Sequence, residues 1–211
     1  MRVRLDDAFR YHAGQFAEIG PEGATLVPYS IASAPEDTKA DGCIEFLVKV
    51  DARGRLGADF EPLRRGHRLR VRGPLGRFTF PDDPVEHDFL FIAGGTGIAP
   101  LRAMIRHARS TVPGTFRLLY SARTPLDFAY RRELCGMARR GEIELTLTAT
   151  RDVTHVWRGE TGRIAATQLS ALIRRPDTLC FVCGPASMVE EVPRMLRSLR
   201  IDRSRIRLEE W

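Results

Sequence analysis

The sequence predicts two domains, an antiparallel β-barrel over residues 1–84 and an α/β domain with a parallel sheet over residues 85–211. Three observations predict this division. Glycine and proline interrupt the first part every few residues and leave only short runs that favour strands. A polar segment with two prolines, residues 81–88, then separates the two parts. Beyond it, strand-like and helix-like runs alternate, which is typical of a parallel sheet covered by helices.

The first part contains runs that suit strands buried on one side. Residues 44–50 (Ile-Glu-Phe-Leu-Val-Lys-Val) are rich in β-branched and aromatic side chains, which favour a pleated, half-buried surface. Residues 68–72 (Arg-Leu-Arg-Val-Arg) alternate charged and apolar side chains, the period expected of a half-exposed strand. Short strands with frequent turns predict a small antiparallel barrel or sandwich.

The second part alternates four strand-like runs with four helix-like runs. The strands are predicted at 89–93, 116–120, 143–148 and 178–182, and the helices at 100–109, 126–139, 165–173 and 186–199. Parallel strands need a crossover between them, so the helices cover the faces of the sheet. The carboxyl ends of the strands then share one edge, where domains of this kind bind their ligands.

Composition and charge exclude several classes of protein. Hydrophobic residues make up 43% of the chain and charged residues 28%, as in a globular protein with a sizeable core. No apolar stretch approaches the ~18–20 residues that span a bilayer, and residues 1–7 lack the apolar core of a signal peptide. We therefore expect a cytoplasmic protein without membrane insertion.

The net charge of +6 has two interpretations. One is a solvated basic surface, and the other is a docking face for acidic partners or phosphates. Nucleic acid is not expected as a partner, because the arginines are not interleaved with exposed aromatic residues and no nucleic-acid-binding motif is visible.

The four cysteines predict neither a disulfide framework nor a metal site. They are scattered along the chain as Cys43, Cys135, Cys180 and Cys183. The last two form a C-x-x-C pair within a predicted strand, where residues three apart point to opposite faces. No second pair completes a zinc site, and no iron–sulfur spacing is present.

A glycine-rich turn, residues 94–100 (Gly-Gly-Thr-Gly-Ile-Ala-Pro), directly follows the first strand of the second part. Glycines let a pyrophosphate approach the backbone without meeting a Cβ. The amides of Gly95, Thr96 and Gly97 and the start of the next helix would face that anion. Pro100 departs from the G-x-G-x-x-G pattern, and a purely structural tight turn is the alternative.

The other strand ends of this part carry side chains that suit a nucleotide. Ser121 and Arg123 follow the second strand, Thr150 and Arg151 follow the third, and Gly184 turns the chain after the fourth. Hydroxyl and guanidinium groups can hold a ribose or its 2′-phosphate, although arginines at strand ends can also simply reach water. Because all four ends would line one crevice, we interpret them as a dinucleotide site.

Several segments, taken in order, resemble the ferredoxin–NADP(+) reductase superfamily. They are 28–33 (Pro-Tyr-Ser-Ile-Ala-Ser), 73–78 (Gly-Pro-Leu-Gly-Arg-Phe), 94–100, 182–185 (Val-Cys-Gly-Pro) and, more weakly, the ending 209–211 (Glu-Glu-Trp). The resemblance covers nearly the whole chain. It implies an FAD-binding antiparallel barrel, with FAD expected before FMN, joined to a parallel-sheet domain that binds NADP or NAD.

By this resemblance, three residues of the first domain contact the flavin. Tyr29 stacks on the isoalloxazine, Ser30 hydrogen-bonds near the N5 atom that accepts hydride, and Ser33 matches the last position of the motif. An aromatic ring suits a flat ligand, and a small hydroxyl can hold N5 without blocking it. An ordinary strand aromatic is the alternative for Tyr29.

Two phosphate contacts of the family are missing from this sequence. Val27 stands where the flavin motif has arginine, and the turn at Gly54 and Gly57 resembles a phosphate-binding turn without its hydroxyl. The loss of one charge-assisted hydrogen bond weakens binding by about one to two powers of ten. We expect either that Arg53 or Arg55 compensates or that the flavin is held loosely.

For the second domain, the resemblance implies residues close to the reacting rings. Cys183 lies beside the nicotinamide, and Glu209 and Trp211 form an ending whose aromatic ring covers the flavin until nicotinamide displaces it. Trp211 as an ordinary chain end is the alternative. Thr150 and Arg151 resemble the pair that reads the 2′-phosphate, which favours NADP(H) over NAD(H).

Together these features predict a reductase that transfers hydride between NAD(P)H and FAD and passes electrons to a separate carrier. A basic reductase suits an acidic carrier such as a ferredoxin, or an oxygenase component. A reductase of free flavin or quinone and a non-catalytic, flavin-poor binding or regulatory subunit are the alternatives. Because family barrels begin one strand earlier, we also expect either an open barrel edge covered by a partner or a fragment.

Overall fold

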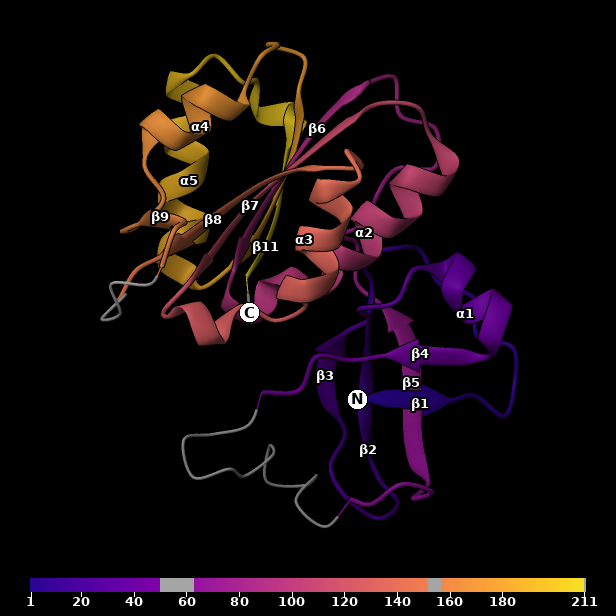
Figure 1. Cartoon of the computed structure of the whole chain (residues 1–211). Coiled ribbons are helices and arrows are strands. Elements are labelled where there is room, and N and C mark those ends of the chain that lie inside the picture. The colour runs from indigo at the N-terminus through magenta and orange to yellow at the C-terminus, as the bar shows by residue number, and fades with distance from the viewer. Residues whose placement is uncertain (50–62, 152–156, 211) are drawn as a thin grey trace.

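The computed structural model describes residues 1–49, 63–151 and 157–210. Figure 1 shows two lobes, one built from short antiparallel strands and one from a twisted sheet with helices on its faces. This arrangement confirms the predicted fold class. Predictions that lie outside the described residues are those for Arg53, Gly54, Arg55, Gly57 and Trp211.

The first lobe contains two small antiparallel sheets around one core. A three-stranded sheet has the order β3-β2-β5, and β1 pairs with β4. The strands are β1 Arg2–Arg4, β2 Phe16–Pro21, β3 Val27–Ser30, β4 Cys43–Glu45 and β5 Leu69–Leu75. A bridge between Ile31 and Phe46 links the two sheets, and both side chains are fully buried. The core of this lobe therefore lies between the sheets.

Two features of this lobe differ from the prediction. A short helix, α1 (Pro35–Asp41), interrupts a part of the chain that was expected to hold only strands. The strand predicted at 44–50 pairs with β1 only as far as Glu45, followed by the single bridge at Phe46. Residues 47–49 instead line a cavity between the lobes.

The second lobe contains a six-stranded parallel sheet in the order β11-β10-β6-β7-β8-β9. Its strands are β6 Asp88–Gly94, β7 Thr115–Ala122, β8 Glu144–Ala149, β9 Glu160–Thr161, β10 Leu179–Gly184 and β11 Ile206–Glu210. The four predicted strands are all present, while β9 and β11 were not predicted. Both are outer strands whose residues are mostly exposed or half-buried, so they lack the apolar signal of the central strands.

Helices cover both faces of this sheet (Figure 1). They are α2 Ile98–Thr111, α3 Arg131–Arg139, α4 Ala166–Leu172 and α5 Ala186–Ser198. Phe89 and Phe91 of β6 pack with α2 and α3, while Leu90 and Ile92 pack with α4 and α5. Because β6 is buried on both faces, its sequence is continuously apolar. None of the helices in the described ranges has both the length and the apolar character needed to cross a membrane.

The same alternation separates the C-x-x-C pair. Cys180 belongs to the core on the α4 and α5 face, and Cys183 belongs to the core on the α2 and α3 face. The two buried thiols therefore lie on opposite sides of β10, as the strand geometry predicted. A dithiol or metal site made from this pair is excluded by that placement.

A hydrophobic contact joins the two lobes. Phe78 and Phe80, which follow β5, pack into the core of the second lobe. The Phe80 ring stacks on that of Phe181 at 5.6 Å between centroids, and Phe78 meets Phe181 edge-on at 6.2 Å. A buried apolar contact of this kind restricts relative motion of two domains. The boundary near residue 84 itself stays a prediction.

Candidate functional site

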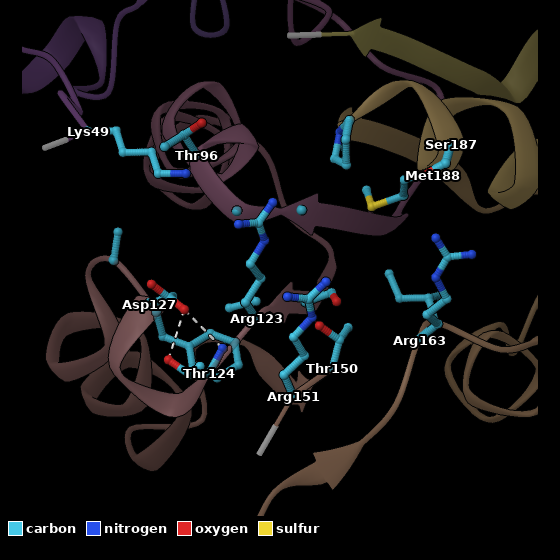
Figure 2. A pocket seen from close by; sticks show the side chains of 18 of the residues that line it. Lys49, Thr96, Arg123, Thr124, Asp127, Thr150, Arg151, Arg163, Ser187 and Met188 are labelled. Atoms are coloured by element: carbon cyan, nitrogen blue, oxygen red, sulfur yellow. Dashed lines mark hydrogen bonds between the residues drawn. The ribbon is translucent and has the colours of Figure 1, made fainter. Parts of the chain in front are cut away.

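A cavity of about 1170 Å³ opens where the two lobes meet, at the carboxyl edge of the parallel sheet (Figure 2). Residues 47–49 of the first lobe form one wall, and the ends of β6, β7 and β8 with the start of α5 form the others. The structure brings together six residues predicted for the dinucleotide, namely Gly95, Thr96, Ser121, Arg123, Thr150 and Arg151. Gly97 and Gly184, also predicted for the dinucleotide, are not among the residues that line this cavity, and the binding roles of all eight stay predictions.

The glycine-rich loop has two separate reasons for its glycines. Gly95 has a φ of 56°, in the left-handed region that favours glycine. At Gly97, an added Cβ would lie 2.3 Å from the carbonyl oxygen of Cys183. Gly184 approaches the same loop, since a Cβ there would lie 3.3 Å from the Cα of Gly94. The ends of β6 and β10 thus meet backbone to backbone, and Gly94, Gly95 and Thr96 of the loop line the cavity.

Tyr120 stabilises the glycine loop through a hydrogen bond and was not predicted as a site residue. Its side chain is fully buried, and its hydroxyl donates to the carbonyl of Gly95 at 2.9 Å. The same oxygen accepts from the amide of Ala129 at 3.2 Å. The available signal was a phenol within the apolar run of β7, since a buried hydroxyl needs a partner.

Cationic side chains surround the cavity from both lobes. Figure 2 shows Arg123 and Arg151 pointing into it from the ends of β7 and β8, with Lys49 on the facing wall. Arg163 also lines the cavity, and its Nη1 lies 3.5 Å from a carboxylate oxygen of Glu191. Lys49 and Arg163 were not predicted, because nothing in the sequence places either beside the glycine loop. The concentration of positive charge suits a ligand with several phosphates.

Cys183 and Glu209 are neighbours on the adjacent strands β10 and β11. The Cys183 Sγ donates to a Glu209 carboxylate oxygen at 4.0 Å. Burial, and then the nearby Glu209, raise the pKa of the Cys183 thiol, so it remains protonated at neutral pH. Burial also raises the pKa of Glu209 to about 7. The pair therefore offers an uncharged thiol next to a carboxyl group able to exchange a proton near neutral pH.

The two segments predicted for the flavin lie at the same end of the first sheet. Phe16 of β2 pairs with Ser30 on one side and with Leu75 on the other. This pairing places the middle of segment 28–33 and the middle of segment 73–78 on either side of one strand. Tyr29 is half-buried and packs at the margin of the core of this lobe.

Ser33 stabilises the fold of its own segment, and its contact with the flavin stays a prediction. Its side chain is buried, and its Oγ accepts from the amide of Glu45 at 3.0 Å. The hydroxyls of Tyr11 and Thr38 lie 3.1 and 3.3 Å from the same atom. Through these contacts the hydroxyl anchors the chain that follows Ser30 to β4 and α1.

Comparisons with known proteins match both lobes. Residues 2–80 match the family described as "Oxidoreductase FAD-binding domain", and residues 91–194 match "Oxidoreductase NAD-binding domain". Ferredoxin–NADP reductase B of Sorangium cellulosum is 33% identical over 219 residues, which cover 97% of this chain and 86% of that protein. The chain belongs to the ferredoxin–NADP(+) reductase superfamily. The resemblance inferred from the sequence is thereby confirmed.

Solved structures of this superfamily share the fold. A ferredoxin reductase of carbazole 1,9a-dioxygenase is 27% identical with a TM-score of 0.82, covering 99% of this chain and 63% of that one. A ferredoxin NADP+ reductase from Neisseria gonorrhoeae, solved with bound FAD and NADP, is 19% identical with a TM-score of 0.77, covering 99% and 90%. By the two domain families and the reductase relative, the chain belongs to the NAD(P)H-dependent flavoprotein oxidoreductases, whose cofactors are FAD and a nicotinamide dinucleotide.

The residues of the cavity fit the dinucleotide of this superfamily. Gly94 and Gly95 of the loop line the cavity and carry no side chain there, which leaves their backbone accessible to a pyrophosphate. Lys49, Arg123 and Arg151 supply charge around that position. For the flavin, the ends of β3 and β5 flank the same end of β2, and the half-buried Tyr29 offers an aromatic ring suited to a flat ligand. Within the described ranges, no group of three or more His, Cys, Asp or Glu side chains could hold a metal ion.

The raised pKa of Glu209 predicts a pH-dependent stability difference between the wild type and Glu209→Gln. From an ordinary value of 4.5, burial raises this pKa to about 7, so the folded state favours the protonated carboxyl. The wild type should therefore lose stability as pH rises from about 4.5 to 7, whereas glutamine stays neutral. With a discount for solvent screening, Glu209→Gln should be about 1–2 kcal/mol more stable than wild type at pH 8.

Urea unfolding at pH 4.5 and pH 8 measures this difference, which should nearly vanish at the lower pH. Glu210→Gln is the matched control, because this neighbouring side chain is exposed and its replacement should leave both values unchanged. Equal stability of wild type and Glu209→Gln at pH 8 would show that the Glu209 carboxylate is well solvated.

Proposed function

We propose that the protein is an NADPH-dependent reductase that passes electrons from its FAD to a separate acidic carrier, such as a ferredoxin or an oxygenase component. The observation that supports this most directly is the cavity shared by the two lobes. When bound, FAD takes a hydride from the nicotinamide and can release the electrons one at a time. The protein's own task is then to bind both cofactors, orient them and exclude water.

In this proposal, the parallel-sheet lobe binds the nucleotide through charge and backbone. The amides of residues 95–97 face the pyrophosphate, and Lys49 approaches it from the other lobe. Arg123 and Arg151, with the hydroxyls of Ser121 and Thr150, surround the ribose and its 2′-phosphate. Guanidinium groups bind phosphate by paired hydrogen bonds, which is our reason for favouring NADPH over NADH.

The catalytic roles proposed for Ser30, Cys183 and Glu209 follow from their surroundings. Ser30 is the last residue of β3, and its hydroxyl is proposed to hydrogen-bond to N5 of the flavin. The buried thiol of Cys183 would lie beside the nicotinamide as an uncharged group, and the Glu209 carboxyl would hold an exchangeable proton near the bound rings. Gly184 lets the chain turn beside the glycine loop. Trp211, outside the described residues, keeps its predicted role of covering the flavin.

Reconstitution tests the proposal directly. Titration of the purified protein with FAD should produce a protein-bound flavin spectrum, and anaerobic NADPH should then bleach it faster than NADH does. Transfer to an added ferredoxin should slow as salt is raised several-fold, because a basic protein attracts an acidic carrier. Val27 favours a second candidate, a flavin-poor regulatory subunit, and failure to take up FAD would support that candidate and contradict ours.

The 2′-phosphate assignment predicts the effect of Arg151→Ala. Loss of one charge-assisted contact should raise the KM for NADPH about 10- to 100-fold, while the KM for NADH changes less than about 3-fold. Steady-state reduction of ferricyanide with each nucleotide measures both values. Arg139→Ala removes an exposed arginine at the end of α3 that does not line the cavity and should change neither. Equal effects on the two nucleotides would exclude Arg151 from 2′-phosphate recognition.

A further inference from the structure

We infer that Arg102 is a positioning residue that fixes the flavin segment against the dinucleotide loop and so sets how the two bound rings meet. The inference rests on the function proposed above. Arg102 is a buried arginine that does not line the large cavity.

One guanidinium joins three segments that are far apart in the sequence. Arg102 is 7% exposed. Its Nη1 donates to the carbonyl of Ala32 and to the carboxylate of Glu45, both at 2.7 Å. Its Nε and Nη2 each approach the same oxygen of Glu133, on α3, at 2.9 Å. The ring of Tyr130 lies against the guanidinium, with its centroid 4.4 Å from Cζ.

The two ends of this connection belong to the two cofactor sites. Ala32 follows Ser30 by two residues, and its own amide donates to the carbonyl of Glu45 at 2.7 Å. Arg102 lies on the first turns of α2, which starts at Ile98 directly after the glycine loop. A helix transmits displacement with little deformation, so a shift of Arg102 relative to Ala32 shifts the loop relative to the flavin segment.

A second arginine extends the polar cluster without touching the flavin segment. Arg106, one turn along α2, donates to Glu133 at 2.9 Å and to Asp37 of α1 at 2.6 Å. Glu133 is therefore shared between the two arginines. Both lobes contribute carboxylates to this cluster, and each guanidinium constrains direction as well as distance.

The apolar contact between the lobes does not by itself fix their relative orientation. The rings of Phe78, Phe80 and Phe181 already hold the lobes together, but apolar contacts are non-directional and tolerate small rotations. A forked guanidinium with fixed acceptors does not tolerate such rotations, because its hydrogen bonds depend on direction. Hydride transfer is steeply sensitive to alignment, since a displacement of about 1 Å can cost about 100-fold in rate.

The test compares Arg102→Lys with a matched control on the same helix. Lysine keeps the charge but has no fork that can reach Ala32, Glu45 and Glu133 together. Arg109→Lys is the control, because Arg109 pairs with Glu142 at 2.8 Å within the second lobe alone. We expect flavin reduction at saturating NADPH to slow about 10- to 100-fold in Arg102→Lys and to stay unchanged in the control.

Binding measurements separate positioning from structure. FAD titration of the apoprotein and NADP+ titration of each variant should give dissociation constants within about 3-fold of wild type, a change below 1 kcal/mol. The long-wavelength charge-transfer absorbance of the flavin–nicotinamide complex should fall, because it reports ring overlap. If Arg102→Lys does not fold, Glu45→Ala is the second variant, because it removes only one acceptor of the guanidinium. We then expect flavin reduction to slow several-fold and the charge-transfer absorbance to fall.

Three outcomes would contradict the positioning role of Arg102. An unchanged reduction rate in a folded variant overturns the inference and leaves the proposed function standing. A loss of FAD affinity that matches the loss of rate also overturns it, because Arg102 would then support only the fold of the binding segment. If the wild type binds both cofactors but NADPH does not reduce it, the proposed function fails and this inference fails with it.

Discussion

Replacing Gly97 by alanine is expected to weaken NADP+ binding by about 100-fold and to destabilise the protein by about 1–3 kcal/mol. The new Cβ would lie 2.3 Å from the carbonyl oxygen of Cys183 and 2.6 Å from its carbonyl carbon. These are backbone atoms of a central strand, so no flexible side chain can move aside. The glycine loop must shift instead, and its amides then no longer point toward the pyrophosphate.

Gly136→Ala is the matched control for that experiment. Gly136 lies inside α3, and an added Cβ would meet only the Nη1 end of Arg140, at 3.3 Å. Alanine in a helix interior should be neutral or stabilise by up to about 1 kcal/mol. Calorimetric titration with NADP+ and urea unfolding measure both variants. Wild-type affinity in Gly97→Ala would mean that the nucleotide does not contact this loop.

The largest effect on stability is expected from Arg117→Met, about 3–5 kcal/mol. The guanidinium of Arg117, on β7, forms an ion pair with Asp88 of β6, and the two side chains are only 3% and 7% exposed. Its Nε also donates to Glu144 of β8 at 3.2 Å. One buried arginine thus connects the starts of three adjacent strands, and its removal leaves the Asp88 carboxylate buried without that partner.

Urea unfolding measures this loss, and two further variants test its cause. Arg117→Met combined with Asp88→Asn should recover part of the stability, because the uncompensated charge is gone. Arg174→Met removes an exposed pair with Glu144 and should cost less than about 1 kcal/mol. Since Arg117 lies at the sheet edge opposite the cavity, NADP+ affinity of the folded variant should stay unchanged. A loss below 1 kcal/mol for Arg117→Met would show that water compensates the Asp88 charge.

The central strands of the second lobe were predictable because burial on both faces demands continuous apolar runs. Residues 89–93 and 178–182 lie almost entirely within β6 and β10 as observed. The predicted helix at 126–139 is shorter, since Tyr130 has a φ of 57° and α3 starts only at Arg131. A single residue in the left-handed region leaves no mark on hydrophobic periodicity, so this break could not be anticipated.

The sequence by itself determined the two-domain fold and the strand ends that line the cavity, because both depend on local pattern and on the rule that parallel strands share an edge. The superfamily and the cofactors followed from the resemblance of its motifs to a known family. Tertiary structure alone decided the contributions of Lys49, Tyr120 and Arg102. Each acts on a group more than 20 residues away in the sequence or on another lobe. Contacts of that range depend on how the lobes pack, and no spacing along the chain encodes them.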